Sequence, residues 1–327
     1  MQKTNFWQEL QKPILALAPM EDVTDTVFRE VIRSVSEQDA LHVLFTEFTS
    51  TDGLCNEKGR EKVSTRLLVN ASESLLNKGT NTKLVAQIWG SDPEKFLESA
   101  KFISSLGHFD GIDINMGCPV KKVVKKSCCS ALINHPQLAK EIVLATKEGT
   151  NLAVSVKTRI GFNSIITEDW IGQLLEVEPA AITVHGRTQK MMSTGLAMWD
   201  EIAKAVQLRD AKNSKTLILG NGDVDSYALA MSHVEQYGVD GVMIGTGIFK
   251  NPWLFNSTEP DINTELKLEL LKKHISLYYS TWGTKGNFNV LKRFFKIYVN
   301  GYDGASSLRD QLMRTKSCEE ALLILNA

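Results

Sequence analysis

The stretches AVSVKTRIG at residues 153–161 and AAITVHGRT at residues 180–188 decide the fold class. Each opens with small and β-branched residues, which favour a buried strand, and closes on Lys, Arg or His side chains. A strand that is apolar on both faces is typical of a parallel sheet covered on both sides by helices. Six further runs have the same form: PILALAPM (13–20), HVLFTEF (42–48), KLVAQIWG (83–90), GIDINMG (111–117), KTLILGNGD (215–223) and GVMIGTG (241–247).

Amphipathic stretches separate most of these eight runs. Three of them, at 93–107, 136–149 and 226–238, end at a glycine, as a helix C-terminus often does. Eight strand–helix units predict an α/β fold of the TIM (β/α)8 barrel type. A doubly wound sheet is the alternative, but APMEDVTD (18–25) is not the glycine-rich GxGxxG turn that such a sheet places after its first strand.

Only helical patterns follow residue 260. They cover 262–282, 288–301, 306–315 and 317–327, and the single good boundary before them is NSTEPDINTE at 256–265. We therefore expect a barrel domain over residues 1–258 and a C-terminal all-helical domain over residues 259–327.

Composition excludes several classes of protein. Hydrophobic residues make up 43% and charged residues 23%, an ordinary globular composition. No apolar run reaches the roughly 18–20 residues needed to cross a bilayer, and the N-terminus lacks the apolar core of a signal peptide, so we expect a cytoplasmic protein that does not bind a membrane. The five cysteines are irregularly spaced, without CxxC or HxxxH, which predicts free thiols and no metal site.

Charge is segregated along the chain. Residues 283–316 contain seven basic and two acidic side chains, although the whole chain has a net charge of −1. A solvated helical face would explain this pattern, and so would a surface that binds a polyanion.

Polar residues fall at the C-terminal ends of the strand runs. In a TIM barrel these ends converge on one mouth, where a polar side chain indicates a site and not scaffold. Successive runs contribute Glu47, Gln87, Asn115, Lys157, Arg159, His185, Arg187, Asn221 and Asp223.

Two of these strand ends suit an anion. GNGDVD (220–225) and GTGIFKNP (245–252) follow the last two runs, where TIM barrels frequently hold a phosphate on backbone N–H groups. Asn221 or Asp223 could accept a hydrogen bond from a ribityl hydroxyl. Lys157 would place a fixed cation near the electron-rich end of a flavin ring, although an ion pair with Glu47 is the alternative.

Cys118 lies in DINMGCPVKKVV (113–124), on a turn between Gly117 and Pro119, and is expected to be exposed in the mouth. A thiol with an ordinary pKa near 8.5 is mostly protonated at neutral pH, which suits a general acid. A nearby Lys121 or Lys122 could instead lower the pKa and produce a nucleophile, but no His–Asp pair is evident to support that role.

These stretches together resemble the dihydrouridine synthase (Dus) family, bacterial type. The resemblance covers essentially the whole chain and rests on six motifs in the family's order, plus a tail, 293–317, that is similar to the family's helical tRNA-binding domain. The motifs are APMEDVTD (18–25), DINMGCPVKKVV (113–124), VKTRIG (156–161), HGRT (185–188), GNGD (220–223) and GVMIGTGIFKNPW (241–253).

The resemblance implies an FMN-dependent oxidoreductase that reduces the C5–C6 double bond of specific uridines in tRNA. NADPH would reduce FMN in the barrel domain, hydride would pass from reduced FMN to C6, and Cys118 would give a proton to C5. Asn115, Lys157 and Arg159 would face the uracil. FMN would be surrounded by Pro19, Met20, Gln87, Lys157, His185, Asn221, Gly222, Asp223, Gly245 and Thr246.

The resemblance also implies that the helical domain binds tRNA, and we expect the enzyme to be a monomer. The candidate RNA-binding residues in this domain are Lys292, Arg293, Lys296, Arg309 and Arg314.

This sequence departs from the family pattern at two places. Ser127 and Cys129 stand where glycine is common, in a loop that would close over the substrate, so we expect its mobility or timing to differ. Thr246 stands where the family usually has arginine in a GRG turn. Because Cys118 and Lys157 are retained, we expect an active enzyme.

Two other interpretations compete with this one. An FMN barrel that acts on a free pyrimidine, similar to a dihydroorotate dehydrogenase, would also present a cysteine or serine from a loop. It would not need the basic helical tail. A catalytically inactive tRNA-binding protein is the second alternative, supported only by the altered loop and Thr246.

Overall fold

The computed structural model describes residues 5–37, 39–74, 82–258 and 260–326, apart from the side chain of Lys285. Its centre is a parallel barrel that closes because β1 pairs with both β2 and β9, and β2 pairs with β4. The eight predicted runs each contain one barrel strand, and β3 (Thr49–Ser50) adds a short pairing to β4. The strands are β1 (Ile14–Leu17), β2 (Val43–Phe45), β4 (Lys83–Trp89), β5 (Gly111–Met116), β6 (Ala153–Arg159), β7 (Ala181–His185), β8 (Leu217–Asn221) and β9 (Gly241–Ile244).

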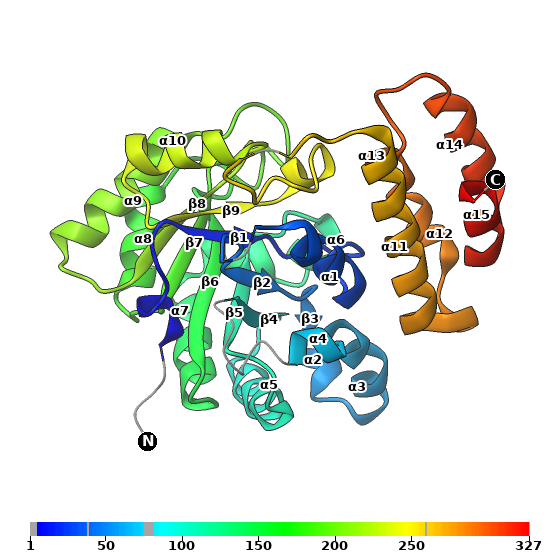
Figure 1. Ribbon diagram of the computed structural model, residues 1–327. Helices are drawn as coiled ribbons and strands as arrows, with labels where there is room; N and C mark the ends of the chain where they lie inside the picture. Colours follow the sequence, from blue (N-terminus) through cyan, green and yellow to red (C-terminus); the bar gives the residue numbers. More distant parts are fainter. Residues whose placement is uncertain (1–4, 38, 75–81, 259, 327) are drawn as a thin grey trace.

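Helices surround this barrel (Figure 1). The long helices α5 (Pro93–Leu106) and α10 (Tyr227–Tyr237) end at Gly107 and Gly238, whose φ angles of 73° and 67° favour glycine. The others are α1 (Thr26–Val35), α2 (Thr51–Leu54), α3 (Glu57–Val63), α4 (Ala71–Ser74), α6 (Lys121–Val124), α7 (Pro136–Glu148), α8 (Thr167–Leu175) and α9 (Trp199–Ala211).

Alternate residues of each barrel strand pack to opposite sides. In β1, Ile14 and Ala16 join the barrel interior, whereas Leu15 and Leu17 pack against the outer helices. Phe6 and Trp7, from a short helix that precedes β1, belong to the interior cluster, with the Trp7 ring 6.4 Å from that of Phe45. Because these aromatic rings fill the N-terminal end of the barrel, its open mouth lies at the carboxyl ends of the strands.

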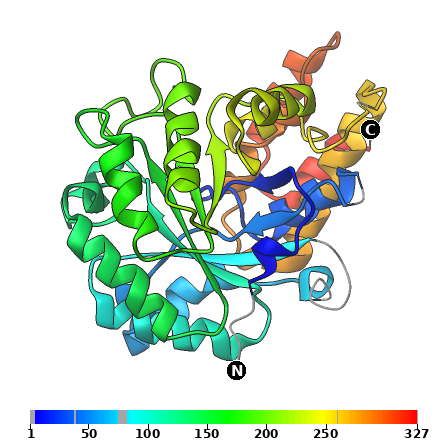
Figure 2. The ribbon, with the colours of Figure 1, turned by 90° about the vertical axis from the view of Figure 1, so that its left-hand side faces the viewer.

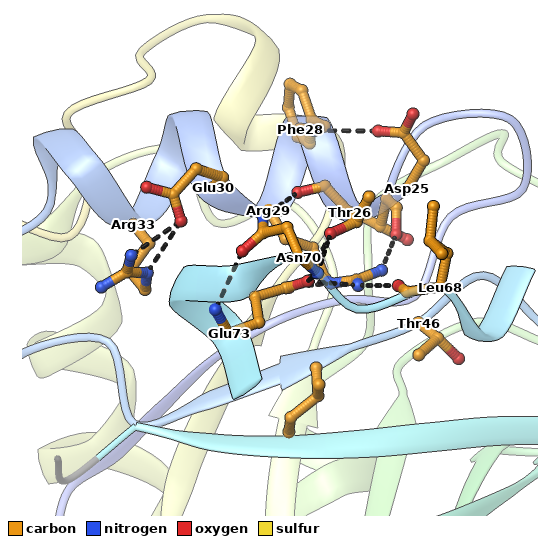
Figure 3. A network of polar contacts seen from close by, with 12 residues as sticks. Asp25, Thr26, Phe28, Arg29, Glu30, Arg33, Thr46, Leu68, Asn70 and Glu73 are labelled. Atoms are coloured by element: carbon orange, nitrogen blue, oxygen red, sulfur yellow. Dashed lines mark hydrogen bonds and ion pairs between the residues drawn. The ribbon is translucent and has the colours of Figure 1, made fainter. Parts of the chain in front are cut away.

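A buried ion pair joins α1 to α4, which lies in the connection between β2 and β4 (Figure 3). The Arg29 guanidinium contacts the Glu73 carboxylate with Nε and Oε1 2.5 Å apart, and both side chains are fully buried. Arg29 also donates to the carbonyl oxygens of Thr24 and Leu68. Since breaking such a buried pair leaves an uncompensated charge, the network holds α4 against α1 at the rim of the mouth.

The C-terminal portion is helical, as expected, and the TIM-barrel prediction is confirmed. The C-terminal helices lie to one side of the barrel in Figure 1 and behind it in Figure 2. Phe294 stacks on Phe28 of α1 with ring centroids 5.1 Å apart, and Trp282 donates to Asp25 at 3.0 Å. The helices are α11 (Thr264–Trp282), α12 (Phe288–Lys292), α13 (Phe295–Tyr298), α14 (Ala305–Arg314) and α15 (Cys318–Leu325).

The prediction of one helix over 288–301 is wrong, because the structure divides this stretch into α12 and α13. Phe294 and Phe295 at the break are both buried, Phe294 against Phe28 and Phe295 against Phe288. Neighbouring residues of one regular helix point in directions about 100° apart, so the change of helix lets both rings reach their partners.

The described residues contain neither a candidate membrane span nor a candidate metal site. No helix in that part of the chain is long and apolar enough to cross a membrane. Nor do its His, Cys, Asp and Glu side chains form a group of three or more that could hold a metal ion.

Candidate active site

A cavity of about 310 Å3 opens at the carboxyl ends of β1 and β6–β9. Backbone and side chains from the predicted strand ends line it, together with glycine-rich turns after β8 and β9. Nine of the ten predicted cofactor residues and Arg159 belong to this lining: Pro19, Met20, Lys157, Arg159, His185, Asn221, Gly222, Asp223, Gly245 and Thr246.

Lys157 is the central cation of this cavity. Its Nζ donates to Asn221 Oδ1 at 2.9 Å, and Asn221 Nδ2 donates to the carbonyl oxygen of Met243 at 2.8 Å. The alternative ion pair with Glu47 is not formed. Burial, followed by the nearby Arg159 charge, lowers the pKa of Lys157 to about 8. Lys157 is therefore mostly charged at neutral pH, and Asn221 fixes the position of that charge.

His185 and Arg187 leave β7 together. Arg187 Nη1 lies 3.1 Å from His185 Nε2, and Arg187 Nη2 contacts both carboxylate oxygens of Asp223 at 2.7 Å. Burial lowers the pKa of His185 to about 2, with Lys157, Arg159 and Arg187 adding to the effect. His185 is thus a neutral imidazole in a cationic cavity, able to exchange hydrogen bonds without adding charge.

Asp223 takes part in the turn that closes this side. Burial would raise its pKa, but hydrogen bonds from Arg187 and from the Ala197 N–H lower the pKa below the ordinary value. The preceding Gly222 has a φ of 128°, and a Cβ there would lie 2.6 Å from the Ala197 Cβ. Only glycine fits this position, which allows backbone N–H groups to approach a ligand closely.

A second polar layer lies under the mouth. Gln87 is fully buried and donates to Asp113 Oδ2 at 2.7 Å, while Asn115 Nδ2 donates to Gln87 Oε1 at 2.9 Å. Burial raises the pKa of Asp113 to about 6, although Ser155 and Gln87 donate to it. Because Gln87 and Asn115 are engaged in this layer, they do not line the cavity above it. They connect the barrel interior to the loop after β5.

Asn115 shapes the turn that carries Cys118. Its Oδ1 accepts from the N–H groups of Gly117 and Cys118, at 3.1 and 2.9 Å. Arg159 Nε donates to the Gly117 carbonyl at 2.7 Å, and burial lowers the pKa of Arg159 to about 10. Arg159 Nη1 also donates to the carbonyl oxygens of Thr188 and Met192, so one guanidinium connects the loops after β5 and β7.

The Cys118 thiol differs from the expectation in two respects. It is half-buried instead of exposed. A hydrogen bond from the Cys129 thiol is the main cause that lowers the pKa of Cys118 to about 7; the Val120 N–H and Arg159 add to it, and burial opposes it. The pKa of Cys118 therefore lies below the ordinary thiol value expected from the sequence.

The residues that replace glycine in this loop have positive φ angles. Ser127 has a φ of 57° and Cys129 a φ of 56°, a region that side chains other than glycine seldom occupy. Cys129 is nevertheless fully buried and begins a short 3-10 helix (Cys129–Asn134). The hydrogen bond from Ser130 Oγ to the Cys118 carbonyl, 2.8 Å long, holds this helix next to the Cys118 turn.

Most of the candidate RNA-binding side chains in the tail have partners within the protein. Lys292 donates to the Met313 carbonyl, Arg309 to the Val299 carbonyl, and Arg293 to the Asp22 carbonyl in the barrel. Lys296 and Arg314 are exposed and make no such contact with the described residues. The tail aromatic residues Phe294, Phe295 and Tyr298 are buried and pack the helices together.

A second cavity, of about 280 Å3, lies between the barrel and the C-terminal helices. Its lining includes Asp22, Asp25 and Glu47 from the barrel and Tyr278 and Trp282 from α11. Burial, followed by the charges of Asp25 and Glu21, raises the pKa of Glu47 to about 7. Arg66 also lines this cavity, so its carboxyl groups outnumber its guanidinium group and the lining is acidic in composition.

Sequence reasoning missed three residues of the site. Arg187 was visible at a polar strand end, but its contact with Asp223 depends on the fold. Asp113 lies within the quoted DIN motif and becomes important because it is fully buried. Cys129 stood out only as a replacement for glycine, and its contact with Cys118 depends on the positive φ at that position.

Comparison with known proteins decides the family. The family model described as dihydrouridine synthase (Dus) matches residues 16–327. The chain belongs to the dihydrouridine synthase family. A "Probable tRNA-dihydrouridine synthase" of Staphylococcus aureus (strain COL) is 44% identical over 326 residues, which cover 99% of this chain and 95% of that protein. A "Probable tRNA-dihydrouridine synthase 2" of Bacillus subtilis (strain 168) is 41% identical, covering 98% of this chain and 96% of that protein.

A solved 2-naphthoyl-CoA reductase has the same barrel fold. It superposes with a TM-score of 0.54 at 9% identity and covers 76% of this chain and 51% of that chain. Membership of the dihydrouridine synthase family makes this protein a flavin-dependent oxidoreductase. The cavity is consistent with that class, because its lining combines a fixed cation at Lys157 with glycine-rich turns after β8 and β9.

Proposed function

We propose that this dihydrouridine synthase reduces the C5–C6 double bond of particular uridines in tRNA, with FMN as its flavin and NADPH as its reductant. The observation that carries the proposal is the Cys118 thiol on the loop after β5, joined through Arg159 to the cation-lined cavity. We further propose that it acts as a monomer in the cytoplasm.

The proposed FMN site uses the lining of the 310 Å3 cavity. Backbone N–H groups around Gly222, Gly245 and Thr246 would receive the phosphate, as glycine-rich loops do elsewhere. Asn221 holds Lys157 where its charge can stabilise negative charge on a reduced ring, and neutral His185 offers a further hydrogen bond. Pro19 and Met20 provide apolar contacts, and Gln87 supports the site from beneath.

Reduced FMN, bound there, supplies the hydride for uracil C6. Cys118 holds the proton that C5 requires, and the Asn115 and Arg159 contacts orient the backbone of its turn. Asn115 and Arg159 would also contact the uracil, together with Lys157. The target base has to leave its stack to reach this mouth, as it does in other enzymes that modify a base.

The two proposed domains have different roles in the reaction. Residues 1–258 would bind FMN and carry out the chemistry, and residues 259–327 would bind tRNA. Lys296 and Arg314 are the best candidates for phosphate contacts in the tail, since they are exposed and unpaired within the described part of the chain. Lys292, Arg293 and Arg309 would have to give up or share their protein contacts to bind RNA.

The test is formation of dihydrouridine in unmodified tRNA by the purified, flavin-containing protein, with NADPH or NADH, mapped by position. Product at one or a few positions, formed faster with NADPH, would support the proposal. A flavin-containing protein that leaves tRNA unchanged but reduces a free pyrimidine would contradict it, and would assign the protein to the alternative class.

A further inference from the structure

The loop that carries Cys118 has four lysines within six residues: Lys121, Lys122, Lys125 and Lys126. They lie on α6 and the turn after it, and all four are exposed. Val123 between them points the other way, into a buried cluster with Cys128 and Cys129. One side of this helical turn is thus anchored in the protein and the other is covered with ammonium groups.

These lysines have no partners among the described residues. None of their side chains takes part in a hydrogen bond or an ion pair there, and residues 117–135 contain no Asp or Glu. By contrast, Lys95 and Lys101 on the neighbouring surface of α5 are paired with Asp52 and Glu98. The surface around those two lysines mixes the two signs of charge, and the surface over residues 121–126 does not.

The spacing of the four lysines also brings like charges close together in the protein without a ligand. Lys121 and Lys125 are four residues apart in sequence, as are Lys122 and Lys126, so each pair lies on one side of the turn. Like charges at this spacing repel one another. An anion spread over both pairs would remove this repulsion.

The position of the lysines identifies the anion. Lys121 follows Cys118 by three residues, which places their Cα atoms within about 11 Å of each other. The loop follows β5 at the same end of the barrel as α1, and α1 packs against the C-terminal helices through Phe28 and Phe294. An RNA strand that brings a uridine to Cys118 would therefore have a phosphate backbone within reach of these ammonium groups.

We propose that Lys121, Lys122, Lys125 and Lys126 bind the backbone phosphates of the RNA strand that carries the target uridine, as a second RNA-binding surface besides the helical domain. This inference rests on the proposed function.

The test compares two variants with the same change of charge. K121Q/K125Q removes one pair from the loop, and K212Q/K215Q removes two exposed lysines that precede β8 at the opposite end of the barrel. Affinity for unmodified tRNA is measured with flavin-containing protein between 50 and 200 mM salt, an interval over which about six to ten phosphate contacts change affinity by roughly 10³–10⁵. Flavin content and melting temperature check that both variants fold.

We expect K121Q/K125Q to reduce the slope of log affinity against log salt by about 1.4, or about 0.7 for each lost contact with a single strand. K212Q/K215Q keeps the wild-type slope, and the charge-preserving K121R/K125R restores it. A K121Q/K125Q slope equal to that of the control pair would overturn the inference. So would an increased KM for NADPH with unchanged tRNA affinity, because the lysines would then bind the phosphates of the dinucleotide.

Failure of this inference is distinguishable from failure of the proposed function. Wild-type protein that neither binds tRNA nor forms dihydrouridine would contradict the proposed function. Wild-type protein that does both, with K121Q/K125Q indistinguishable from the control pair, would contradict the lysine surface alone.

Discussion

Two cavities at the mouth of this barrel have similar volumes and differently charged linings. The cavity over β6–β9 measures about 310 Å3 and is lined by Lys157, Arg159 and Arg187. The cavity beneath the C-terminal helices measures about 280 Å3 and is lined by Asp22, Asp25 and Glu47. The first cavity therefore suits an anionic cofactor better than the second, and the strand ends divide the mouth by electrostatics as well as by shape.

In each cavity the surroundings shift the pKa of one titratable group toward its neutral form. In the cationic cavity the pKa of His185 falls to about 2, by burial and then by three neighbouring cations. In the acidic cavity the pKa of Glu47 rises to about 7, by burial and then by two neighbouring carboxylates. The same two causes act with opposite sign, because burial and like charges both disfavour the ionised form.

The largest expected effect comes from Cys118→Ala, which leaves both cavities unchanged. We expect uridine reduction to fall by roughly 10²–10⁴, the usual contribution of a positioned proton donor. Flavin content and the rate of flavin reduction by NADPH are expected to stay at wild-type values. Loss of bound flavin in this variant would show that the loop after β5 contributes to the cofactor site itself.

Removing the central cation tests the cationic cavity directly. We expect Lys157→Met to lower the rate of flavin reduction, flavin retention, or both, by roughly 10² if the fixed charge acts as one electrostatic donor. Asn221→Ala, which removes the hydrogen bond that positions Lys157 and the one to the Met243 carbonyl but keeps the charge, should have a smaller effect of the same kind. Stopped-flow reduction by NADPH and the flavin content of the purified variants measure this. Wild-type values for Lys157→Met would contradict the role.

The pH dependence of uridine reduction tests the contact between Cys118 and Cys129. The donor is active when protonated, so we expect the rate of the uridine-reducing step to fall as the pH rises through about 7. Cys129→Ala removes the main cause of the lowered pKa of Cys118. It should therefore move this fall in rate, the alkaline limb of the pH profile, to higher pH. Cys129→Ser retains a donor and should leave the limb near its wild-type position. An unchanged limb in Cys129→Ala would exclude the thiol contact as its cause.

The smallest expected effect concerns the acidic cavity. Glu47 has a pKa of about 7 in the folded protein against 4.5 for the ordinary group. The stability that the protonated carboxyl contributes is therefore complete below pH 4.5 and is lost as the pH rises through 7. Glu47→Gln keeps an acceptor for the Asp22 N–H and should lack this loss, gaining on the order of 1–2 kcal/mol over wild type at pH 8 relative to pH 4. Melting temperatures across this pH range measure the difference.

The barrel could be predicted because its signal is local. In each strand run, such as AVSVKTRIG, consecutive residues alone predict which part is buried, and the polar end indicates the mouth. The lining residues Lys157, His185 and Asn221 followed from that rule alone. The same rule also marked Gln87, which the structure places one layer below the mouth, because depth in the barrel cannot be seen in a single strand run.

Contacts between segments could not be predicted. The lowered pKa of Cys118 depends on a backbone angle at Cys129, eleven residues later. The break between α12 and α13 depends on where Phe28 and Phe288 lie. Nothing in the sequence pairs the five candidate RNA-binding residues of the tail, but three of them have carbonyl partners that only the folded chain supplies.

The most direct test of the central claim separates the two half-reactions in wild-type protein and in Cys118→Ala. Both are reduced with NADPH in the absence of oxygen and then mixed with unmodified tRNA, while the visible flavin absorbance is followed. We predict equal bleaching by NADPH in the two proteins, and rapid recovery of absorbance on adding tRNA in the wild type alone. Equal recovery in Cys118→Ala would contradict the assignment of Cys118 as proton donor. No recovery in the wild type would contradict uridine in tRNA as the substrate.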